Sequence, residues 1–456
     1  MKSVALHNLG CKVNSYETEV MQQKLVEKGY RIAPFDTRAD IYIVNTCTVT
    51  NIADRKSRQM LHRAKQLNPE AVVVAVGCYV QTGQESLMKD NSVDLCIGNN
   101  RKRDIAEILE EYFRRQGEEA GEKPSCSRTE EKTLGNTTIL DIAHTLEYEE
   151  AQLAGTAEHT RVYIKIQDGC NQFCSYCAIP YARGRVRSRR LSDILAEVQA
   201  LTKAGYREIV LTGIHISSYG IDFEDRAYDG SSRLTELVEA LHEVPGIQRI
   251  RLSSLEPRVV TKETARRLAA LPKVCPHFHL SLQSGCDTTL RRMNRHYTTG
   301  EYYTSVEYLR SAFERPAITT DVIVGFPGET EAEFRQTKEF LEKVGFYEMH
   351  IFKYSRRGGT SAADMPGQVS EQIKRQRSNE LLAMEKEQSK SFRRAYIDRE
   401  AEVLLEETVE VGGELWRVGH TKDYVKVAVR ADEAPSANTV VRVKVRGFLT
   451  DEVMQS

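Results

Sequence analysis

The sequence lacks a net charge from which a partner could be inferred. Its 64 lysine and arginine residues nearly balance 65 aspartate and glutamate residues, which leaves a formal net charge of −1. A chain this neutral has no general attraction for a polyanion. Any surface for a nucleic acid must therefore be a local patch of basic side chains.

Long apolar runs are missing as well. The longest, AVVVAVGC at residues 71–78, is far shorter than the roughly 20 residues that a membrane-spanning helix needs. The opening MKSVALHNLGCKVNSYETE lacks the apolar centre of a signal peptide. We therefore expect a cytoplasmic protein with no membrane contact. In that reducing compartment, the ten cysteines are better explained as metal ligands or catalytic thiols than as a disulfide framework.

No internal repeat or low-complexity tract divides the 456 residues, a length that exceeds what one hydrophobic core organises. In the first part of the chain, short apolar runs alternate with helix-like stretches. The runs lie at residues 3–10, 41–46, 71–77 and 93–98. This alternation predicts a doubly wound parallel sheet in residues 1–113. The acidic, polar text that follows predicts a linker over residues 114–155.

A second α/β series is expected in residues 156–386. Its apolar runs lie at residues 162–166, 208–213, 249–254, 277–282, 319–325 and 347–352. Six such units, with helical text between them, predict a partial (β/α)6 barrel rather than the full eight-stranded one. Residues 370–398 predict one long charged helix. The alternating short strands after it predict a small antiparallel β-barrel, so that a third module covers residues 387–452.

Three cysteines, Cys170, Cys174 and Cys177, lie within eight positions directly after the first predicted barrel strand; we call them the barrel cysteine set. Such close thiolates let one loop wrap an iron–sulfur cluster. Because a fourth cysteine is missing, one iron of a [4Fe–4S] cluster would stay open to a small ligand, as in reactive rather than structural metal centres. The alternative is a zinc site completed by His159 or His215, although the position after a barrel strand favours an active site.

The spacing C-x3-C-x2-C, with the aromatic Tyr176 before the last cysteine, resembles the signature of the radical S-adenosylmethionine superfamily. The resemblance implies that the open iron chelates S-adenosylmethionine and that the reduced cluster cleaves it to a 5′-deoxyadenosyl radical. It also implies that polar or glycine-rich turns after the barrel strands contact this cofactor, whereas the alternative is that they only reverse the chain. The candidate contacts are Tyr176, Gly213, Ser253, Glu256, Gln283, Asp321 and Gly325.

Three apolar runs of the first module end directly in cysteine, at Cys11, Cys47 and Cys78, which we call the amino-terminal cysteine set. The carboxyl ends of parallel strands share one edge of a sheet, so these thiols are expected to converge and to hold a second cluster with one open iron. Buried cysteines without a ligand are the alternative. The phrases LGCKVNSYETE, VNTCTVTNIADRKSRQ and GCYVQ resemble the amino-terminal module of methylthiotransferases, which implies an auxiliary [4Fe–4S] cluster here. Cysteines that fit neither set are Cys96, Cys126, Cys275 and Cys286.

Five arginines in RGRVRSRR, residues 183–190, follow the barrel cysteine set. Arginine presents paired planar donors to phosphate, so Arg183, Arg185 and Arg187 are candidate RNA contacts; the alternatives are salt bridges inside the fold or a contact with the cofactor carboxylate. The last strands resemble the TRAM domain, a small β-barrel that often binds RNA, and offer Arg417 and Lys426 as further candidates. Such alternating basic residues can equally form the solvated face of a strand, and in one branch of the family this module recognises a ribosomal protein.

The order of modules resembles the radical methylthiotransferases over essentially the whole chain. LGCKVN and NTCTVT are similar to the branch that acts on N6-threonylcarbamoyladenosine, whereas YGCQMN and NTCSVR are typical of the isopentenyladenosine branch and NTCGFI of the ribosomal-protein branch. The resemblance implies a tRNA methylthiotransferase that adds a 2-methylthio group to N6-threonylcarbamoyladenosine-37, next to the anticodon. The radical would take the hydrogen from adenine C2, and the auxiliary cluster would present a methylated sulfur to that carbon.

The same resemblance implies two [4Fe–4S] clusters and S-adenosylmethionine as cofactors, and tRNA, a reducing electron donor and a sulfur source as partners. Two reactions of the family remain as alternatives, one on isopentenyladenosine and one on a ribosomal protein. An alternative of a different class is a non-catalytic iron–sulfur protein that binds RNA.

Overall fold

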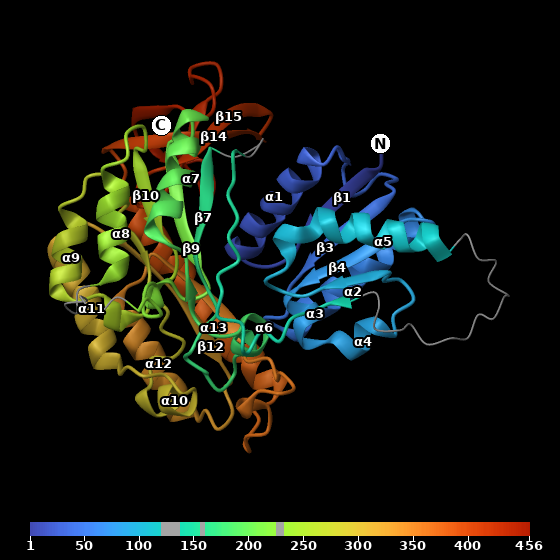
Figure 1. The fold of residues 1–456 in the computed structure, drawn as a ribbon. Coiled ribbons are helices and arrows are strands. Elements are labelled where there is room, and N and C mark those ends of the chain that lie inside the picture. Colours follow the sequence, from blue (N-terminus) through green and yellow to red (C-terminus); the bar gives the residue numbers. More distant parts are fainter. Residues whose placement is uncertain (120–136, 156–159, 225–231) are drawn as a thin grey trace.

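Parallel pairing organises the first module of the protein, whose computed structural model describes residues 1–119, 137–155, 160–224 and 232–456 (Figure 1). Six strands form one sheet in the order β2-β1-β3-β4-β5-β6, and every pair in it is parallel. The strands are β1 (Ser3–Asn8), β2 (Arg31–Ile32), β3 (Ile41–Thr46), β4 (Val72–Gly77), β5 (Leu95–Ile97) and β6 (Thr137–Thr138). The helices are α1 (Lys12–Glu27), α2 (Asn51–Leu67), α3 (Cys78–Thr82), α4 (Gln84–Met88) and α5 (Ile105–Glu119).

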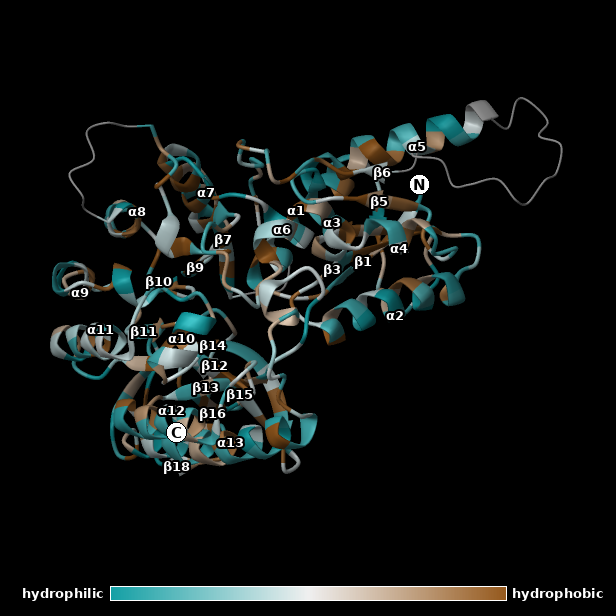
Figure 2. Cartoon of the chain, turned by 90° about the horizontal axis from the view of Figure 1, so that it is seen from below, coloured by the Kyte–Doolittle hydropathy of each residue, from teal (hydrophilic) through white to brown (hydrophobic). Residues whose placement is uncertain are grey.

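Helices cover both faces of this sheet. β3 and β4 are buried almost along their whole length, as parallel strands between two helical layers must be. Leu61 of α2 shares a core with Tyr42 on one face, and Met21 of α1 shares a core with Ile43 on the other. Figure 2 shows apolar residues gathered on the strands, while α2 is mostly hydrophilic. The predicted doubly wound sheet is confirmed.

Six parallel strands form the curled sheet of the second module. They are β7 (Arg161–Asp168), β9 (Glu208–Gly213), β10 (Arg249–Leu252), β11 (His277–His279), β12 (Ala317–Val324) and β13 (Glu348–Lys353). They pair as β10-β9-β7 and β11-β12-β13, and two isolated parallel bridges, Ile250 to Val274 and Leu255 to Leu280, join the two groups. A short strand, β8 (Arg187–Ser188), adds antiparallel to β7. Each predicted barrel strand is found, and the partial barrel is confirmed.

Helices surround this barrel on its outer side (Figure 1). They are α7 (Leu191–Lys203), α8 (Arg233–His242), α9 (Lys262–Ala269), α10 (Asp287–Arg292), α11 (Thr299–Ala312) and α12 (Glu331–Val344). The short helix α6 (Ile179–Arg183) instead packs against α3 of the first module. The first module lies beside β7, where α1 packs against the barrel. Tyr16 of α1 belongs to the barrel core, and its hydroxyl donates to Glu197 Oε1 of α7 at 3.0 Å. The two modules therefore share a packed interface.

The last module covers the end of the barrel at which the amino ends of its strands lie. After the long helix α13 (Glu371–Arg394), strands β14 (Glu400–Val411), β15 (Glu414–His420), β16 (Lys426–Arg430), β17 (Val440–Lys444), β18 (Gly447–Phe448) and β19 (Met454–Gln455) form one sheet. All its pairs are antiparallel except β16 with β19. At the amino end of β10, Arg249 donates to the carbonyl of His420 at 2.8 Å and Arg251 donates to that of Lys422 at 2.9 Å. The predicted antiparallel sheet is confirmed.

Three features depart from or limit the expected boundaries. α5 continues past residue 113, and α13 runs through residue 386. Part of the expected linker belongs to the first sheet, because β6 pairs with β5.

In the described part of the chain, no helix has both the length and the apolar character required to cross a bilayer.

Candidate functional site

The amino-terminal cysteine set lies at the carboxyl ends of three neighbouring strands. Cys11 precedes α1 after β1, Cys47 follows β3, and Cys78 begins α3 after β4. Gly10 has φ +110°, and a Cβ built on it would lie 3.0 Å from the Cys47 sulfur, so this turn needs a glycine. Burial, together with the neighbouring Cys78 and Cys11, raises the pKa of Cys47 to about 11. The structure thus brings together three thiols that are far apart in sequence.

The barrel cysteine set occupies the loop between β7 and α6. Gly169 opens this loop at φ +70°, where a Cβ would lie 1.8 Å from the Arg185 carbonyl oxygen, and the Cys170 amide donates to the Gly184 carbonyl at 3.0 Å. Burial raises the pKa of Cys177 to about 12 and that of Cys170 to about 11, and in both cases Cys174 adds to the increase. Three thiols that discourage one another's ionisation are suited to a cation that binds them together.

Both donor sets fit an iron–sulfur cluster with one open iron, since each supplies three soft sulfur ligands. The zinc alternative gains no support from His215, whose ring nitrogens lie 2.6 Å from Ser218 Oγ and 3.3 Å from Glu256 Oε2 rather than against a cysteine. His159 lies outside the described residues. Cys126 does too, whereas the other cysteines that fit neither set are buried: Cys96, Cys275 and Cys286.

Arg183 links the two cysteine sets. It follows the barrel set on α6, which packs against α3, and its side chain has no exposed surface. Its Nε donates to Cys78 Sγ at 3.2 Å, and its Nη2 donates to Asn14 Oδ1 at 2.6 Å. A guanidinium from the barrel therefore reaches a thiol of the first module.

A buried network of charges surrounds Arg183. Glu17 of α1 accepts from Arg183 Nη1 at 2.5 Å, from Lys165 of β7 at 2.7 Å and from Lys102 at 2.5 Å. Asp168, at the end of β7, lies 2.7 Å from Lys165 and 3.2 Å from Arg183. Burial raises the pKa of Glu17, but these cations outweigh it and hold the pKa well below its usual range. Glu17 is therefore ionised and binds the two modules together.

This network corrects the predicted RNA contacts in the arginine run. Arg183 and Arg187 are fully buried, and Arg187 Nη2 lies 3.8 Å from Asp168 Oδ2. Neither offers its charge to a polyanion, and the alternative of salt bridges inside the fold holds for both. Arg185 is exposed, with its guanidinium 4.6 Å from the centre of the Phe173 ring, so its RNA contact stays a prediction.

Arg295 was not found by sequence reasoning. It lies in the loop after α10, and its Nη1 donates to Cys174 Sγ at 3.2 Å while its Nε donates to Tyr297 Oη at 3.1 Å. A single basic residue in a polar loop carries no pattern that distinguishes it from surface arginines. Each cysteine set therefore has one arginine hydrogen-bonded to a sulfur.

Most candidate cofactor contacts lie at the carboxyl ends of the barrel strands. Gly213 and Gly325 end or follow β9 and β12, and Ser253 follows β10, with its hydroxyl 3.5 Å from Thr212 Oγ1. Glu256 Oε2 accepts from Gln172 of the cysteine loop at 3.3 Å. The Tyr176 ring packs edge-on against Phe326. These residues share the rim of the barrel with the barrel cysteine set.

Gln283 lies next to β12, the strand that contains Asp321. The backbone amide of Gln283 donates to the backbone carbonyl of Asp321 at 2.8 Å, and Gln283 has a φ of +70°. Asp321 is inside β12 rather than at its end, and its side chain lies 3.4 Å from His279 Nε2. His279, Asp321 and His350 of β13 form a group whose possible metal-ligand atoms all lie within 4.8 Å of one another. Cofactor contact by Asp321 stays a prediction.

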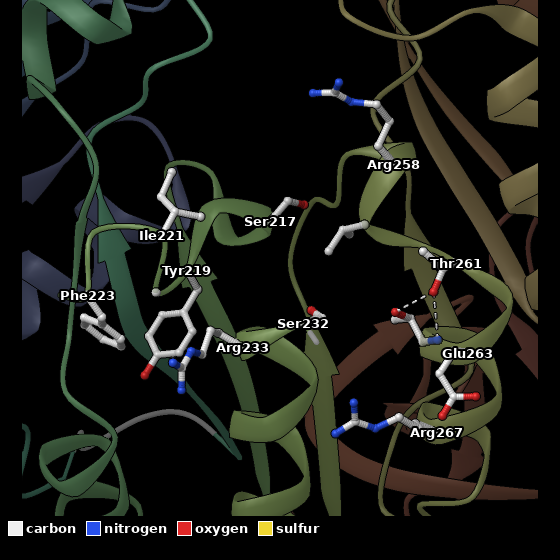
Figure 3. Close-up of a pocket in the computed structure, with 13 residues that line it drawn as sticks. Ser217, Tyr219, Ile221, Phe223, Ser232, Arg233, Arg258, Thr261, Glu263 and Arg267 are labelled. Carbon is white, nitrogen blue, oxygen red and sulfur yellow. Dashed lines mark hydrogen bonds between the residues drawn. The ribbon is translucent and has the colours of Figure 1, made fainter. Parts of the chain in front are cut away.

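A cavity of about 540 Å³ adjoins the rim between the loop after β9 and α9 (Figure 3). Ser217 and Arg258 line it, and both also contact Glu256: Ser217 Oγ accepts from the Glu256 amide at 2.8 Å, and Arg258 Nε lies 3.4 Å from its carboxylate. None of the described residues that line this cavity is a cysteine. It is therefore separate from both cysteine sets.

The last module places its two candidate RNA contacts at the amino ends of the barrel strands. Arg417 is half-buried on β15, and Lys426 Nζ lies 3.8 Å from Glu407 Oε1. The barrel cysteine set follows the carboxyl end of β7, at the other end of the barrel. RNA binding by Arg417 and Lys426 stays a prediction.

Comparison with known proteins agrees with this arrangement. The model of the radical SAM superfamily matches residues 164–341, and that of the uncharacterized protein family UPF0004 matches residues 3–98. Over 446 residues, the chain is 39% identical to the threonylcarbamoyladenosine tRNA methylthiotransferase MtaB of Bacillus subtilis, covering 98% of this chain and 94% of that protein. The chain belongs to the radical SAM methylthiotransferase family.

Other methylthiotransferases are similar over comparable lengths. The protein of the same name from Aquifex aeolicus is 38% identical, with 90% of this chain and 96% of that protein covered. The tRNA-2-methylthio-N(6)-dimethylallyladenosine synthase of Acetivibrio thermocellus is 33% identical, with 98% of this chain and 89% of that protein covered. Among solved structures, the radical S-adenosylmethionine methyltransferase TsrM of Kitasatospora setae matches with a TM-score of 0.54 at 16% identity, over 79% of this chain and 74% of that one. That likeness supports the fold alone.

Proposed function

We propose that this methylthiotransferase acts on tRNA and converts N6-threonylcarbamoyladenosine at position 37 into its 2-methylthio derivative. The observation that carries the proposal is that Arg183 joins two cysteine triplets from two different sheets, because it follows the barrel triplet on α6 and donates to Cys78 Sγ of the other triplet. One set is needed to generate a radical and the other to deliver sulfur. Relatives named for this reaction match nearly the whole chain, which supports the choice of substrate.

The barrel cysteine set would hold the cluster that binds S-adenosylmethionine, and the amino-terminal set would hold an auxiliary cluster. When bound, these cofactors supply a 5′-deoxyadenosyl radical for hydrogen abstraction at adenine C2 and a methylated sulfur for that carbon. Cys170, Cys174 and Cys177 fix the first cluster, and Cys11, Cys47 and Cys78 fix the second. The candidate cofactor contacts would orient S-adenosylmethionine: Tyr176, Gly213, Ser253, Glu256, Gln283, Asp321 and Gly325.

The chain also has to receive the base from the RNA. Adenine C2 is reached once the base has left the stacked anticodon loop, as in other enzymes that modify bases. Arg185 is exposed and would contact a phosphate of that loop. Arg417 and Lys426 would meet a more distant part of the tRNA, because their module lies at the other end of the barrel. The reaction takes place in the cytoplasm and draws on a reducing electron donor and a sulfur source.

The test is anaerobic turnover by the fully reconstituted protein, followed by mass spectrometry of the tRNA nucleosides. One tRNA carries N6-threonylcarbamoyladenosine at position 37 and a second carries isopentenyladenosine. We expect the 2-methylthio product from the first only. Product from the second alone would assign the isopentenyladenosine reaction instead, and RNA binding without release of 5′-deoxyadenosine would identify a non-catalytic iron–sulfur protein.

A further inference from the structure

Lys12 is a cation without a carboxylate partner next to the amino-terminal cysteine set. It follows Cys11 directly, begins α1 and keeps solvent-accessible surface. Two other lysines near the interface of the modules, Lys102 and Lys165, both bind Glu17. Within the described ranges, no ion pair or hydrogen bond engages the Lys12 ammonium.

Two arginines share the surroundings of Lys12. Burial, and after it the positive charges of Arg251 and Arg161, lower the pKa of Lys12 to about 8, against an opposite effect of Cys11. Burial also lowers the pKa of His277, and Arg251 and Lys12 add to that decrease. The nearby carboxylates are already engaged: Glu208 Oε1 accepts from Arg251 at 2.8 Å, and Glu406 Oε2 accepts from Arg161 at 3.1 Å. The region around Lys12 therefore carries a surplus of positive charge.

A cation in such surroundings is stabilised by an anion that a ligand brings. A phosphate of the RNA backbone is one source, and a carboxylate on the reacting base is the other. The position favours the base, because Lys12 adjoins a ligand of the cluster that would deliver sulfur to adenine C2. The N6 substituent of adenine is attached to C6, and only the ring nitrogen N1 separates C6 from C2. In N6-threonylcarbamoyladenosine, this substituent ends in a free carboxylate.

We propose that the Lys12 ammonium binds the threonyl carboxylate of N6-threonylcarbamoyladenosine and thereby selects this base over adenosines whose N6 substituent is uncharged. The inference rests on the proposed function and adds the residue that determines specificity. An uncharged substituent leaves Lys12 without a counter-ion in a region that already holds Arg161 and Arg251. Selection therefore has an attractive and a repulsive part.

The experiment compares two anticodon stem-loop RNAs that differ in one group. One carries N6-threonylcarbamoyladenosine, and the other carries the same base with its carboxylate converted to a primary amide. Binding to the reconstituted protein is measured by fluorescence anisotropy without reductant, so that no turnover occurs. We expect the wild type to bind the carboxylate RNA about ten-fold more tightly than the amide RNA. In Lys12→Met this ratio should fall to about one, and in Lys12→Arg it should persist.

Lys24→Met is the matched control, because Lys24 lies on the same helix and pairs with Glu27 at the surface. It should keep the ten-fold ratio. A preference that persists in Lys12→Met, or equal binding of both RNAs by the wild type, would overturn the role of Lys12. A phosphate contact instead would weaken both RNAs equally in Lys12→Met and leave their ratio unchanged, which also overturns it.

Turnover separates this inference from the proposed function. Formation of the 2-methylthio product by the wild type supports the function whether or not Lys12 discriminates. Absence of product from the carboxylate RNA, with clusters and S-adenosylmethionine cleavage intact, overturns the function itself. If Lys12→Met loses iron or fails to fold, the wild-type comparison of the two RNAs and the Lys12→Arg ratio still decide the inference.

Discussion

At the scale of single residues, two arginines distinguish these cysteine sets from simple groups of thiols. Arg183 donates to Cys78 and Arg295 donates to Cys174, both at 3.2 Å. Hydrogen bonds and positive charge at cluster sulfurs raise the reduction potential of an iron–sulfur centre. Because one arginine serves each set, the two potentials can be adjusted separately.

Replacing Arg183 by lysine tests this separation. Lysine keeps the positive charge beside Glu17 but has no second nitrogen to donate to Cys78 while it contacts Glu17 and Asn14. We expect the potential of the auxiliary cluster to fall by on the order of 60 mV, which corresponds to about 1.4 kcal/mol for one electron. Redox titration followed by electron paramagnetic resonance measures it. The barrel cluster should keep its potential, as should both clusters in the exposed control Arg185→Lys; an unchanged auxiliary potential in Arg183→Lys would contradict the role of this hydrogen bond.

Cysteine substitutions in the two sets should separate two activities. Cys174→Ala removes a proposed ligand of the cluster that binds S-adenosylmethionine, so release of 5′-deoxyadenosine should fall at least about a thousand-fold, to the background rate. Cys47→Ala should keep that release and lose the thiomethylated product. Both are followed by chromatography of one reaction mixture. The buried Cys286→Ala, outside both sets, is the control, and normal product from a reconstituted Cys47→Ala protein would make the amino-terminal thiols structural.

The arginine run shows where sequence reasoning about single residues ends. Five arginines in eight positions predicted a phosphate surface, yet Arg183 and Arg187 point inward to Glu17 and Asp168. Their acidic partners lie far away in sequence or on another element, so local text cannot give the direction of the side chains. The cysteines were more predictable because the ends of parallel strands fix where they lie.

At the scale of elements, apolar runs identified every long strand of the first two sheets. Two-residue strands such as β6 (Thr137–Thr138) and β8 (Arg187–Ser188) were missed, because two residues show no periodicity and depend on a neighbouring strand for their pairing. The contact of the segment between β15 and β16 with the barrel could not be predicted from the sequence either. The carbonyls of His420, at the end of β15, and of Lys422, in the loop, accept from Arg249 and Arg251. Every residue has a backbone carbonyl, so a sequence does not show which ones make such contacts.

Asp423, in that loop, makes this contact dependent on pH. Burial raises its pKa from 3.8 to about 6. A buried carboxyl whose pKa is higher in the folded than in the unfolded protein destabilises the fold once it is ionised. The protein therefore loses stability as the pH rises from the unfolded pKa through the folded pKa of about 6. We expect Asp423→Asn to be more stable than the wild type at about pH 7.5, by on the order of 2 to 3 kcal/mol, and equally stable near pH 4. Urea unfolding at both values measures the difference, and a gain that is the same at both would contradict this cause.

At the scale of the whole molecule, the site exists only where the modules meet. The first module contributes Cys11, Cys47 and Cys78, the barrel contributes the other triplet, and the last module closes the far end. The order of the modules was predictable from composition and motifs. Their docking was not, since it depends on pairs such as Tyr16 with Glu197 and Glu17 with Lys165, whose members are 181 and 148 residues apart.

Glu17 is the residue through which this docking can be tested. It is the carboxylate that Lys102 of the first module and Lys165 and Arg183 of the barrel share. Glu17→Gln leaves three buried cations with less negative charge between them, and breaking a buried ion pair in this way costs about 3 to 5 kcal/mol. Calorimetry should show a lower unfolding temperature, with the first module separating from the barrel before the rest unfolds. The surface variant Glu27→Gln on the same helix should unfold like the wild type. If Glu17→Gln also unfolds at the wild-type temperature in a single step, the charge network does not hold the two cysteine sets together, and packing of α1 against β7 does so alone.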